Sequence, residues 1–457
     1  MIIQDLRTYR SLFTQYTELR AQENRIMNIA YLNGNLVRNT KSAVGGVSAR
    51  AYAGGSWGFA SAPGYDQVRE VISEATLNAA FLDQRAKKGH APFAPSCPVA
   101  ERSFATTKPR LSQSEIMQFM QELDGYIAGK YPSLSSRTVS LYNLDMEKSL
   151  LTSDGASLYS LLARTVFGVS LSKDTATGPV EVFESAGGLG QFEDVFGEPQ
   201  SLFPVIDTLY EHLEKKSEGV YAEAGLKECV LDSALAGILA HEAIGHTAEA
   251  DLVHAGSVAG DYLNQLCASP LITLVDFAHT FRGQPCPMPI YIDDEGTLAE
   301  DQVLIEQGVL KGYMHNKHSA RRFGVSSTGN ARAYEYFDEP LIRMRNTVIV
   351  PGHSKLADMI ASIEDGYYLM KPSNGQADTT SEFMFGVVLG YEIKQGKLGR
   401  AIRDLTISGV AFDVLKSVTM VSDDLKWSNA GMCGKKQLIP VGMGGAAVKC
   451  RINIGGR

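Results

Sequence analysis

Three segments in the first half of the chain repeat their apolar residues at the spacing of a helix. In residues 6–20 the repeat comprises Leu6, Tyr9, Phe13 and Tyr16. Residues 65–86 form a second amphipathic segment, and residues 111–132 open with Ser112 and Glu115 at the spacing of a capping box. The pattern therefore predicts a helix in each of these three segments.

Between and after these segments, short runs alternate or are rich in β-branched residues, which is typical of strands. Residues 48–61 and 137–144 are such runs, and Asp154-Gly155 stands between two more as a hairpin signal. Residues 187–201 are rich in glycine and acidic side chains, and helical spacing follows over 202–218. We interpret this region as the connection between two lobes.

The second half of the chain begins with a helix around His241 and continues in strand-like runs and tight turns. Hairpin turns are expected at 307–312 and 395–397, where glycine stands beside long polar side chains. The predicted fold class is α+β with two lobes. A mixed α/β N-terminal domain covers residues 1–220 with the connecting segment, and a strand-rich C-terminal domain that carries the histidine-bearing helix covers residues 221–457.

Composition places the chain among soluble globular proteins, with 44% apolar and 21% charged residues in 457 positions. The net charge of −8 and the lack of a lysine- or arginine-rich run argue against nucleic acid as a partner. No apolar stretch is long enough to cross a membrane, and residues 1–13 lack the basic and apolar regions of a secretory signal, so we expect neither feature. Six scattered cysteines fit free thiols in a reducing compartment, so we expect a cytoplasmic protein.

One helical stretch, ILAHEAIGHTAEA at residues 238–250, carries two histidines and a glutamate. His241 and His246 are five positions apart, so a regular helix would turn them roughly 140° away from each other. A single π-turn would reduce that angle to roughly 50°, and such turns occur mostly at functional sites. Gly245, directly before the second histidine, eases the distortion through its permissive backbone. A lone histidine here would be interpreted as a core residue, but two histidines with Glu242 favour a metal site.

A catalytic zinc site needs a third protein ligand and leaves the fourth position to water. The sequence offers several further histidines for that role, namely His254, His279, His315, His318 and His353. Cys433 lies between glycines in GMCGK, where a tight backbone could present a thiolate, whereas Cys450 alternates like a packed strand residue. Spacing alone does not choose between Cys433 and the histidines. The GMCGKK and GMGG stretches lack the residues of a phosphate-binding loop, and we interpret GMGG at 442–445 as a turn.

The histidine-bearing helix and Cys433, together with further motifs, make the second lobe similar to the TldD/PmbA peptidases, the family also called modulators of DNA gyrase. The resemblance runs from about residue 240 to the C-terminus through HEAIGHTAEAD, IDDEGT, VLIEQGVLKGYMHNKHSARRFG, STGNARA, MRNTVIVPG, GQADTTSEFMFG and GMCGK. The first lobe resembles the family more loosely, through GVSARAYAGGSWGFAS. The PmbA branch loses the HExxxH residues and this chain keeps them, so the TldD branch is the better match.

The resemblance implies a metallopeptidase with metal ligands at His241, His246 and Cys433 and a general base at Glu242. The metal would be zinc or another divalent transition metal such as iron. The implied substrates are unfolded proteins and peptides, and the implied assembly is a homodimer, or a heterodimer with a paralogue that lacks the metal motif. The alternative is a non-catalytic subunit that holds peptides or supports assembly and whose metal is structural.

Two acidic residues follow His246 where the family also carries acids. Glu249 and Asp251 are candidates to orient the ligand imidazoles by hydrogen bonding, or they are solvated charges at the end of the helix. The GQADTTSEF run at 375–383 is a candidate strand for pairing with an extended substrate, although pairing inside the protein's own sheet explains it as well.

Overall fold

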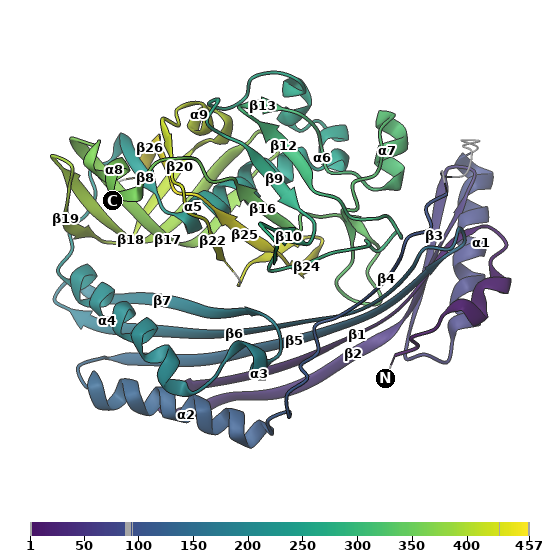
Figure 1. Ribbon diagram of the computed structural model, residues 1–457, viewed down its shortest axis with the longest axis horizontal. Coiled ribbons are helices and arrows are strands. Elements are labelled where there is room, and N and C mark those ends of the chain that lie inside the picture. Colours follow the sequence, from purple (N-terminus) through teal and green to yellow (C-terminus); the bar gives the residue numbers. More distant parts are fainter. Residues whose placement is uncertain (1, 87–92, 94, 429, 456–457) are drawn as a thin grey trace.

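The N-terminal lobe is built on one long, curved sheet (Figure 1). The structure is a computed structural model that describes residues 2–86, 93, 95–428 and 430–455. The strand order is β3-β2-β1-β5-β6-β4, and β7 also pairs with β6. These strands are β1 (Tyr16–Leu32), β2 (Asn35–Ala53), β3 (Ser56–Pro63), β4 (Val99–Ser103), β5 (Ser136–Thr152), β6 (Ser157–Thr175) and β7 (Gly178–Leu189). Neighbouring strands are antiparallel except for β4, which runs parallel to β6.

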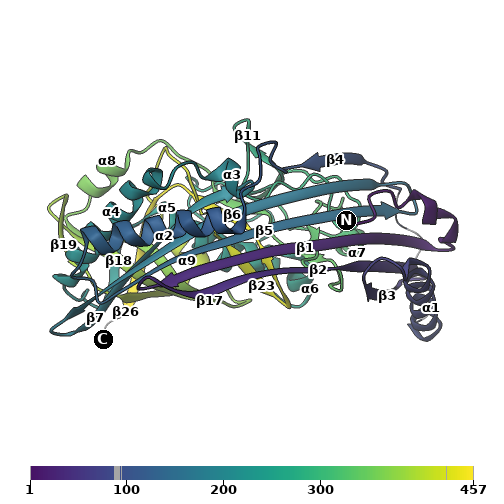
Figure 2. The same ribbon diagram turned by 90° about the horizontal axis from the view of Figure 1, so that it is seen from below.

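Helices cover the outer face of this sheet, and one of them, at Phe203–Ser217, also contacts the C-terminal lobe (Figures 1 and 2). They are α1 (Val68–Ala86), α2 (Gln113–Lys130), α3 (Phe192–Val195) and α4 (Phe203–Ser217). The helix α1 packs near β2 and β3, whereas α2 and α4 pack on the other end of the sheet. Phe192, Ile206 and Leu209 are buried in this second core. The segment expected to connect the lobes therefore belongs to the outer layer of the N-terminal lobe, because its apolar residues bury against the sheet.

On β1 and β2, the inner face of the sheet meets the C-terminal lobe through polar side chains, whereas β5 and β6 also contribute apolar contacts. Alternate residues of β1 on this face are buried, namely Glu18, Arg20, Gln22 and Asn24. The side-chain amide of Asn24 donates to the carbonyl oxygen of Tyr334 at 2.7 Å. Arg50 on β2 forms ion pairs with both Glu18 and Glu295. Because buried polar groups need partners, these contacts fix how the two lobes lie against each other.

Five strands of the C-terminal lobe pair in a closed ring, in the order β17-β8-β26-β20-β18, with β18 pairing back to β17. They are β8 (Gly225–Leu231), β17 (Asp365–Ala377), β18 (Glu382–Lys394), β20 (Leu405–Val410) and β26 (Val448–Gly455). The ring is extended by β19 (Lys397–Ile402) and β21 (Met420–Val421), and it is accompanied by α8 (Leu356–Ala361) and α9 (Ala411–Lys416). Residues 375–383 span the β17–β18 hairpin and pair within the protein's own sheet.

A second sheet of this lobe has the order β13-β12-β9-β16-β25-β22. Its strands are β9 (Leu274–Phe277), β12 (Gln302–Glu306), β13 (Val309–Leu310), β16 (Asn346–Ile349), β22 (Lys426–Ser428) and β25 (Gly442–Gly445). Shorter elements are β10 (Thr280–Phe281), β11 (Gln284–Pro285), α7 (Lys317–Phe323), β14 (Ala331–Arg332), β15 (Leu341–Ile342), β23 (Met432–Lys435) and β24 (Gln437–Pro440). The predicted α+β class with a strand-rich second lobe is confirmed.

The GMGG stretch lies in strand β25, so its interpretation as a turn is wrong. Its glycines let a helix approach the sheet closely: a Cβ on Gly237 of that helix would lie 3.0 Å from the backbone nitrogen of Gly444. The same helix also contacts β17 of the strand ring. The histidine-bearing helix is thus held between the two sheets of the C-terminal lobe.

Local signals in the sequence are confirmed where neighbouring residues decide the structure. Ser112 and Glu115 form a capping box at the start of α2. The expected hairpin turns join β5 to β6, β12 to β13 and β18 to β19. The helix predicted over 6–20 is wrong, because only a 3-10 turn forms at Arg7–Leu12 and β1 begins at Tyr16. Long-range pairing of β1 with both β2 and β5 overrides the helical spacing there.

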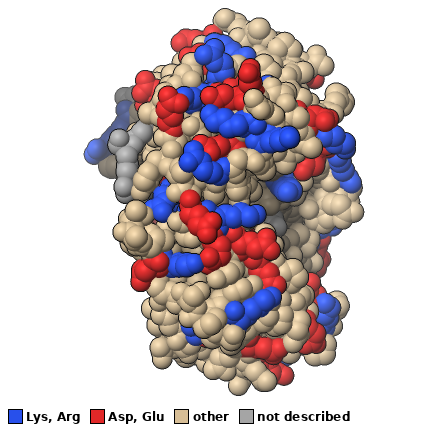
Figure 3. Space-filling view, turned by 90° about the vertical axis from the view of Figure 1, so that its left-hand side faces the viewer, with Lys and Arg blue, Asp and Glu red and all other residues tan. Residues whose placement is uncertain are grey.

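The end of the molecule formed by α4, α8 and β19 carries both signs of charge side by side (Figure 3). Ion pairs of β18 and β19 include Arg400 with Glu392, whose atoms lie 2.9 Å apart. All six cysteines are free thiols, and Cys97 alone is exposed. Within the described part of the chain, no helix is long and apolar enough to cross a membrane.

Candidate metal centre

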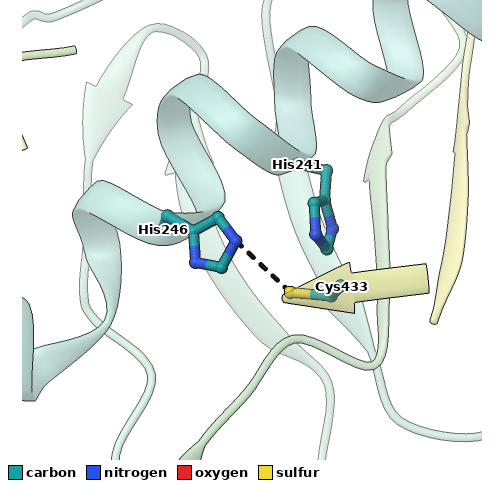
Figure 4. Close-up of side chains that lie close together, drawn as sticks. All are labelled: His241, His246 and Cys433. Atoms are coloured by element: carbon teal, nitrogen blue, oxygen red, sulfur yellow. Dashed lines mark hydrogen bonds between the residues drawn. The ribbon is translucent and has the colours of Figure 1, made fainter. Parts of the chain in front are cut away.

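The histidine-bearing helix changes its winding where the two histidines lie. It begins as α5 (Ser233–Ile238), where Asp232 Oδ1 accepts the N–H of Leu235 at 2.8 Å. It widens to a π-helix over Leu239–Gly245 and tightens to a 3-10 turn over His246–Ala248, before α6 (Ala250–His254). The predicted π-turn is confirmed. The ring centroids of His241 and His246 are 5.2 Å apart, and both rings point toward the same strand (Figure 4).

Gly245 is required for packing rather than for backbone freedom. Its φ of −57° and ψ of −51° are ordinary helical values that any residue adopts. A Cβ at this position would lie 2.0 Å from the sulfur of Met344, which is fully buried. The glycine thus lets the helix approach Met344, and this corrects the expectation that a permissive backbone explains it.

The hairpin β23–β24 brings Cys433 to the two histidines (Figure 4). The Cys433 sulfur lies 3.3 Å from His246 Nε2. One donor atom from each of Cys433, His241 and His246 lies within 4.8 Å of the others, and no other group of three such residues is found among the described residues. Cys450 is elsewhere, buried in β26 opposite Cys229. The structure therefore brings together the three residues to which the sequence pointed and leaves the other candidates apart.

His241 has unmet hydrogen-bonding capacity. It is fully buried, and its ring nitrogens make no hydrogen bond of ordinary geometry within the described part of the chain, although the ring lies close enough to the Cys433 thiol to lower the pKa of that thiol. A buried polar group without a partner costs roughly 1–3 kcal/mol. A metal ion bonded to one nitrogen would remove much of that penalty, and two imidazoles with a thiolate are a donor set that suits zinc. The residues present therefore fit a zinc ion.

The charges at this site favour an ionised cysteine. Burial raises the pKa of the Cys433 thiol, but His241 and His246 outweigh burial and lower the pKa to about 4. Burial lowers the pKa of His246, but the Glu249 carboxylate and Cys433 raise it to about 10. In the metal-free protein Cys433 is thus a thiolate beside an imidazolium, and the thiolate is the form that binds metals.

Glu249 and Asp251 occupy different positions relative to the histidines. Glu249 is fully buried and its Oε2 lies 3.1 Å from His246 Nδ1. Lys435 on β23 reaches both acids, at 2.9 Å from Glu249 and 2.7 Å from Asp251. Burial raises the pKa of Glu249, but His246 and then Lys435 outweigh it, so the net pKa is lowered. Glu249 therefore contacts a candidate ligand directly, whereas Asp251 contacts Lys435 and the backbone N–H of Leu252.

Glu242 stands beside the three donor atoms without joining them. Its Oε2 lies 3.7 Å from His246 Nε2, and its side chain is 24% exposed. A carboxylate in this position lies next to the imidazoles and remains open to solvent. That arrangement suits proton transfer more than ligation.

Buried arginines hold the hairpin that carries Cys433, and no sequence motif pointed to them. Arg343 donates to the carbonyl oxygen of Cys433 at 2.7 Å, and Arg332 donates to that of Pro440 at 2.8 Å. Arg164, from the N-terminal lobe, donates to the carbonyl oxygen of Gly431 at 3.0 Å. Charged residues inside otherwise apolar strand runs were the available signal, because a buried guanidinium needs several acceptors.

Protein-family comparisons match most of the C-terminal lobe and part of the first. The PmbA/TldA metallopeptidase C-terminal domain matches residues 225–456, and domain 1 of the same metallopeptidases matches residues 17–79. These two matches cover the strand ring, the candidate metal centre and the first strands of the N-terminal sheet.

Relatives with sequence similarity carry protease names. A metalloprotease TldD homologue of Buchnera aphidicola (subspecies Schizaphis graminum) is 40% identical over 51% of this chain and 49% of its own length. The chain thus matches about half the length of this relative. A zinc metalloprotease TldD homologue of Saccharolobus solfataricus is 27% identical over 90% of both chains.

A solved structure shares the whole fold. The crystal structure of a modulator of a DNA gyrase from Thermotoga maritima has a TM-score of 0.77, covers 96% of both chains and is 19% identical in sequence. At that identity the likeness concerns the fold alone.

Proposed function

The chain belongs to the PmbA/TldD metallopeptidase family, and on that premise we propose that it is a zinc peptidase that cleaves peptide bonds in unfolded proteins or peptides. The observation that carries the proposal is the meeting of two imidazoles and one thiolate, whose donor atoms lie within 4.8 Å of one another. The zinc in the name of the Saccharolobus relative supports this choice of metal.

His241, His246 and Cys433 would hold the metal, and Glu242 would move the proton. Zinc in such a site polarises a carbonyl group and makes water reactive near neutral pH. Glu242 takes a proton from the attacking water as the water oxygen bonds to the carbonyl carbon. It then delivers that proton to the amide nitrogen while the carbon–nitrogen bond breaks. The products are a carboxylic acid and an amine, which equilibrate with solvent protons.

Glu249 would set the orientation of His246. When His246 Nδ1–H donates to Glu249 Oε2, 3.1 Å away, Nε2 is left free to face the metal and Cys433. The ammonium group of Lys435 contacts the same carboxylate and favours its charged form. A charged Glu249 in turn makes the imidazole a stronger donor toward a metal.

A structural metal is the competing explanation for the same residues. Structural zinc sites are closed by four protein ligands, whereas catalytic sites have three and an open position. Three donor groups gather here within the described part of the chain, and the adjacent Glu242 is partly exposed. This count supports the catalytic proposal over a non-catalytic peptide-holding subunit.

The test combines metal analysis with digestion of an unfolded protein and a peptide library. Purified protein should contain about one zinc per chain, as a single three-ligand site predicts. A chelator should abolish cleavage of both substrates, and added zinc should restore it. A protein that holds its full complement of metal and cleaves neither substrate would overturn the catalytic proposal and favour a structural metal.

A further inference from the structure

Within the described residues, the strand that carries Cys433 pairs with a single other strand. It belongs to β23–β24, a two-stranded pair that is separate from the two larger sheets of its lobe. The carbonyl oxygen of Gly431, just before this strand, accepts from the backbone N–H of Val441 at 3.1 Å, and carbonyl groups in and beside the hairpin also accept from arginine side chains. Two of these, Arg332 and Arg343, come from the same lobe. The position of the thiolate therefore depends on contacts outside the hairpin.

The third arginine comes from the other lobe and is distant in sequence. Arg164 lies on β6 directly opposite Leu144 of β5, on the inner face of the N-terminal sheet. It is 2% exposed. Its Nη1 donates to the carbonyl oxygen of Gly431, 267 residues further along the chain, and lies 3.8 Å from the sulfur of Met432. These are the two residues before Cys433.

Burying the guanidinium group of Arg164 costs free energy because the group loses its hydration. Removing such a charge from water carries a penalty that is offset only by well-placed acceptors. A carbonyl contact that merely joined the lobes could be made anywhere along the inner face. This contact is made at Gly431, two residues before the cysteine that provides the thiolate.

We propose that Arg164 is a positioning residue through which the N-terminal lobe sets the place of Cys433 in the metal centre. The inference rests on the proposed function, in which Cys433, His241 and His246 bind the metal. The C-terminal lobe supplies all three ligands, yet the thiolate reaches its full ligand geometry only when the two lobes are docked. In this proposal the N-terminal lobe contributes to the geometry of the metal centre through Arg164.

A second inner-face arginine provides the matched control. Arg20 on β1 is also buried, and it donates to carbonyl oxygens of Glu335 at 3.1 Å and Asp338 at 2.6 Å in the C-terminal lobe. These carbonyl groups lie outside the β23–β24 hairpin. Losing Arg20 therefore weakens the docking of the lobes without removing a contact to the residues around Cys433.

The experiment compares Arg164→Met, Arg164→Lys and Arg20→Met with the unaltered full chain. Zinc affinity is measured by competition with a chromophoric chelator, and cobalt-loaded protein is examined for thiolate-to-cobalt charge-transfer absorption. Arg164→Met should lower zinc affinity about 10- to 100-fold, the usual effect of losing a group that supports a ligand, and should weaken the cobalt–thiolate band. Arg164→Lys should recover part of both, because an ammonium group still donates to a carbonyl oxygen. Arg20→Met should change neither by more than about twofold, a bound that lies below that ligand-support effect.

A measurement on metal-free protein separates this inference from the proposed function. The rate at which a thiol reagent modifies Cys433 is followed by mass spectrometry, with thermal unfolding as a check that each variant is folded. Arg164→Met should speed the reaction several-fold by loosening the hairpin, and Arg20→Met should leave it unchanged. If Arg164→Met and Arg20→Met changed the labelling rate equally, the positioning role would be overturned. It would also be overturned if Arg164→Met changed neither the labelling rate nor the zinc affinity. An unaltered chain that binds no zinc would refute the proposed function, and the labelling rates would still decide the role of Arg164.

Discussion

Replacing Gly245 by alanine adds one methyl group at a crowded point of the histidine-bearing helix. An ideal Cβ there would lie 2.0 Å from the sulfur of Met344 and 3.1 Å from its terminal carbon. Favourable contacts between such atoms need about 3.5–4.0 Å. Met344 is fully buried within the largest core of the C-terminal lobe, so it has little room to withdraw.

Two effects of this substitution oppose each other. Alanine is favoured over glycine inside a helix by about 1 kcal/mol, and the helical φ of −57° at Gly245 would allow that gain. Overpacking a filled core costs about 1–3 kcal/mol. Because the expected overlap with Met344 is severe, the upper part of that range applies. The free energy of unfolding should therefore fall by about 2 kcal/mol, the difference between the two effects.

Thermal unfolding of four proteins tests this sign: the unaltered chain, Gly245→Ala, Met344→Ala and the double variant. Gly245→Ala should lower the melting temperature of the unaltered chain. In the Met344→Ala background, Gly245→Ala should leave the melting temperature unchanged or raise it, because the overlapping sulfur is absent. A higher melting temperature for the single Gly245→Ala variant would refute the packing argument and return the explanation to backbone freedom.

Further predictions concern the metal, the base, pH and assembly. Cys433→Ala should lower zinc affinity by orders of magnitude in a chelator competition, whereas Cys450→Ala should retain it; equal effects would contradict the ligand set. Glu242→Gln should reduce peptide hydrolysis by about 10²- to 10⁴-fold with zinc content unchanged, and loss of zinc would reassign Glu242. In metal-free protein, folding lowers the pKa of Cys433 from 9.0 to about 4, so its contribution to stability declines as pH falls below 9.0. Folding raises the pKa of His246 from 6.5 to about 10, so its contribution to stability declines as pH rises above 6.5. The melting-temperature difference between the unaltered chain and Cys433→Ala should therefore be greatest between pH 6.5 and 9.0 and shrink on both sides; a flat difference would argue against the ion pair. Light scattering should show at least a dimer, and an active monomer would contradict that expectation.

The features that the sequence predicted well are decided by a few neighbouring residues. The five-residue spacing of His241 and His246 is incompatible with a shared site on a regular helix, so the π-helix follows from the two residue types alone. Capping and hairpin signals work for the same reason, as Ser112 and Glu115 show at the start of α2. The sequence motif also pointed to Cys433, although spacing alone left several histidines as alternatives.

The features that it could not predict depend on contacts between distant segments. Residues 16–20 have helical apolar spacing, yet they form a strand because both edges of β1 find partners. Gly245 is adjacent to Met344 only after the chain has folded, so its packing role was not visible. Arg164 and its acceptor Gly431 are separated by 267 residues, and no local pattern links them.

The short strand β23 carries the thiolate of the metal centre and also a lysine that acts on the orientation of His246. The strand β23 has four residues, and Cys433 and Lys435 lie two positions apart on it, so their side chains share a face. Cys433 contacts His246 Nε2, while Lys435 binds Glu249, the acid that contacts His246 Nδ1. A shift of this strand would therefore disturb the thiolate and the orientation of the imidazole at the same time. That double dependence gives a physical reason for surrounding so short a hairpin with buried guanidinium groups, whose desolvation would otherwise be a net cost.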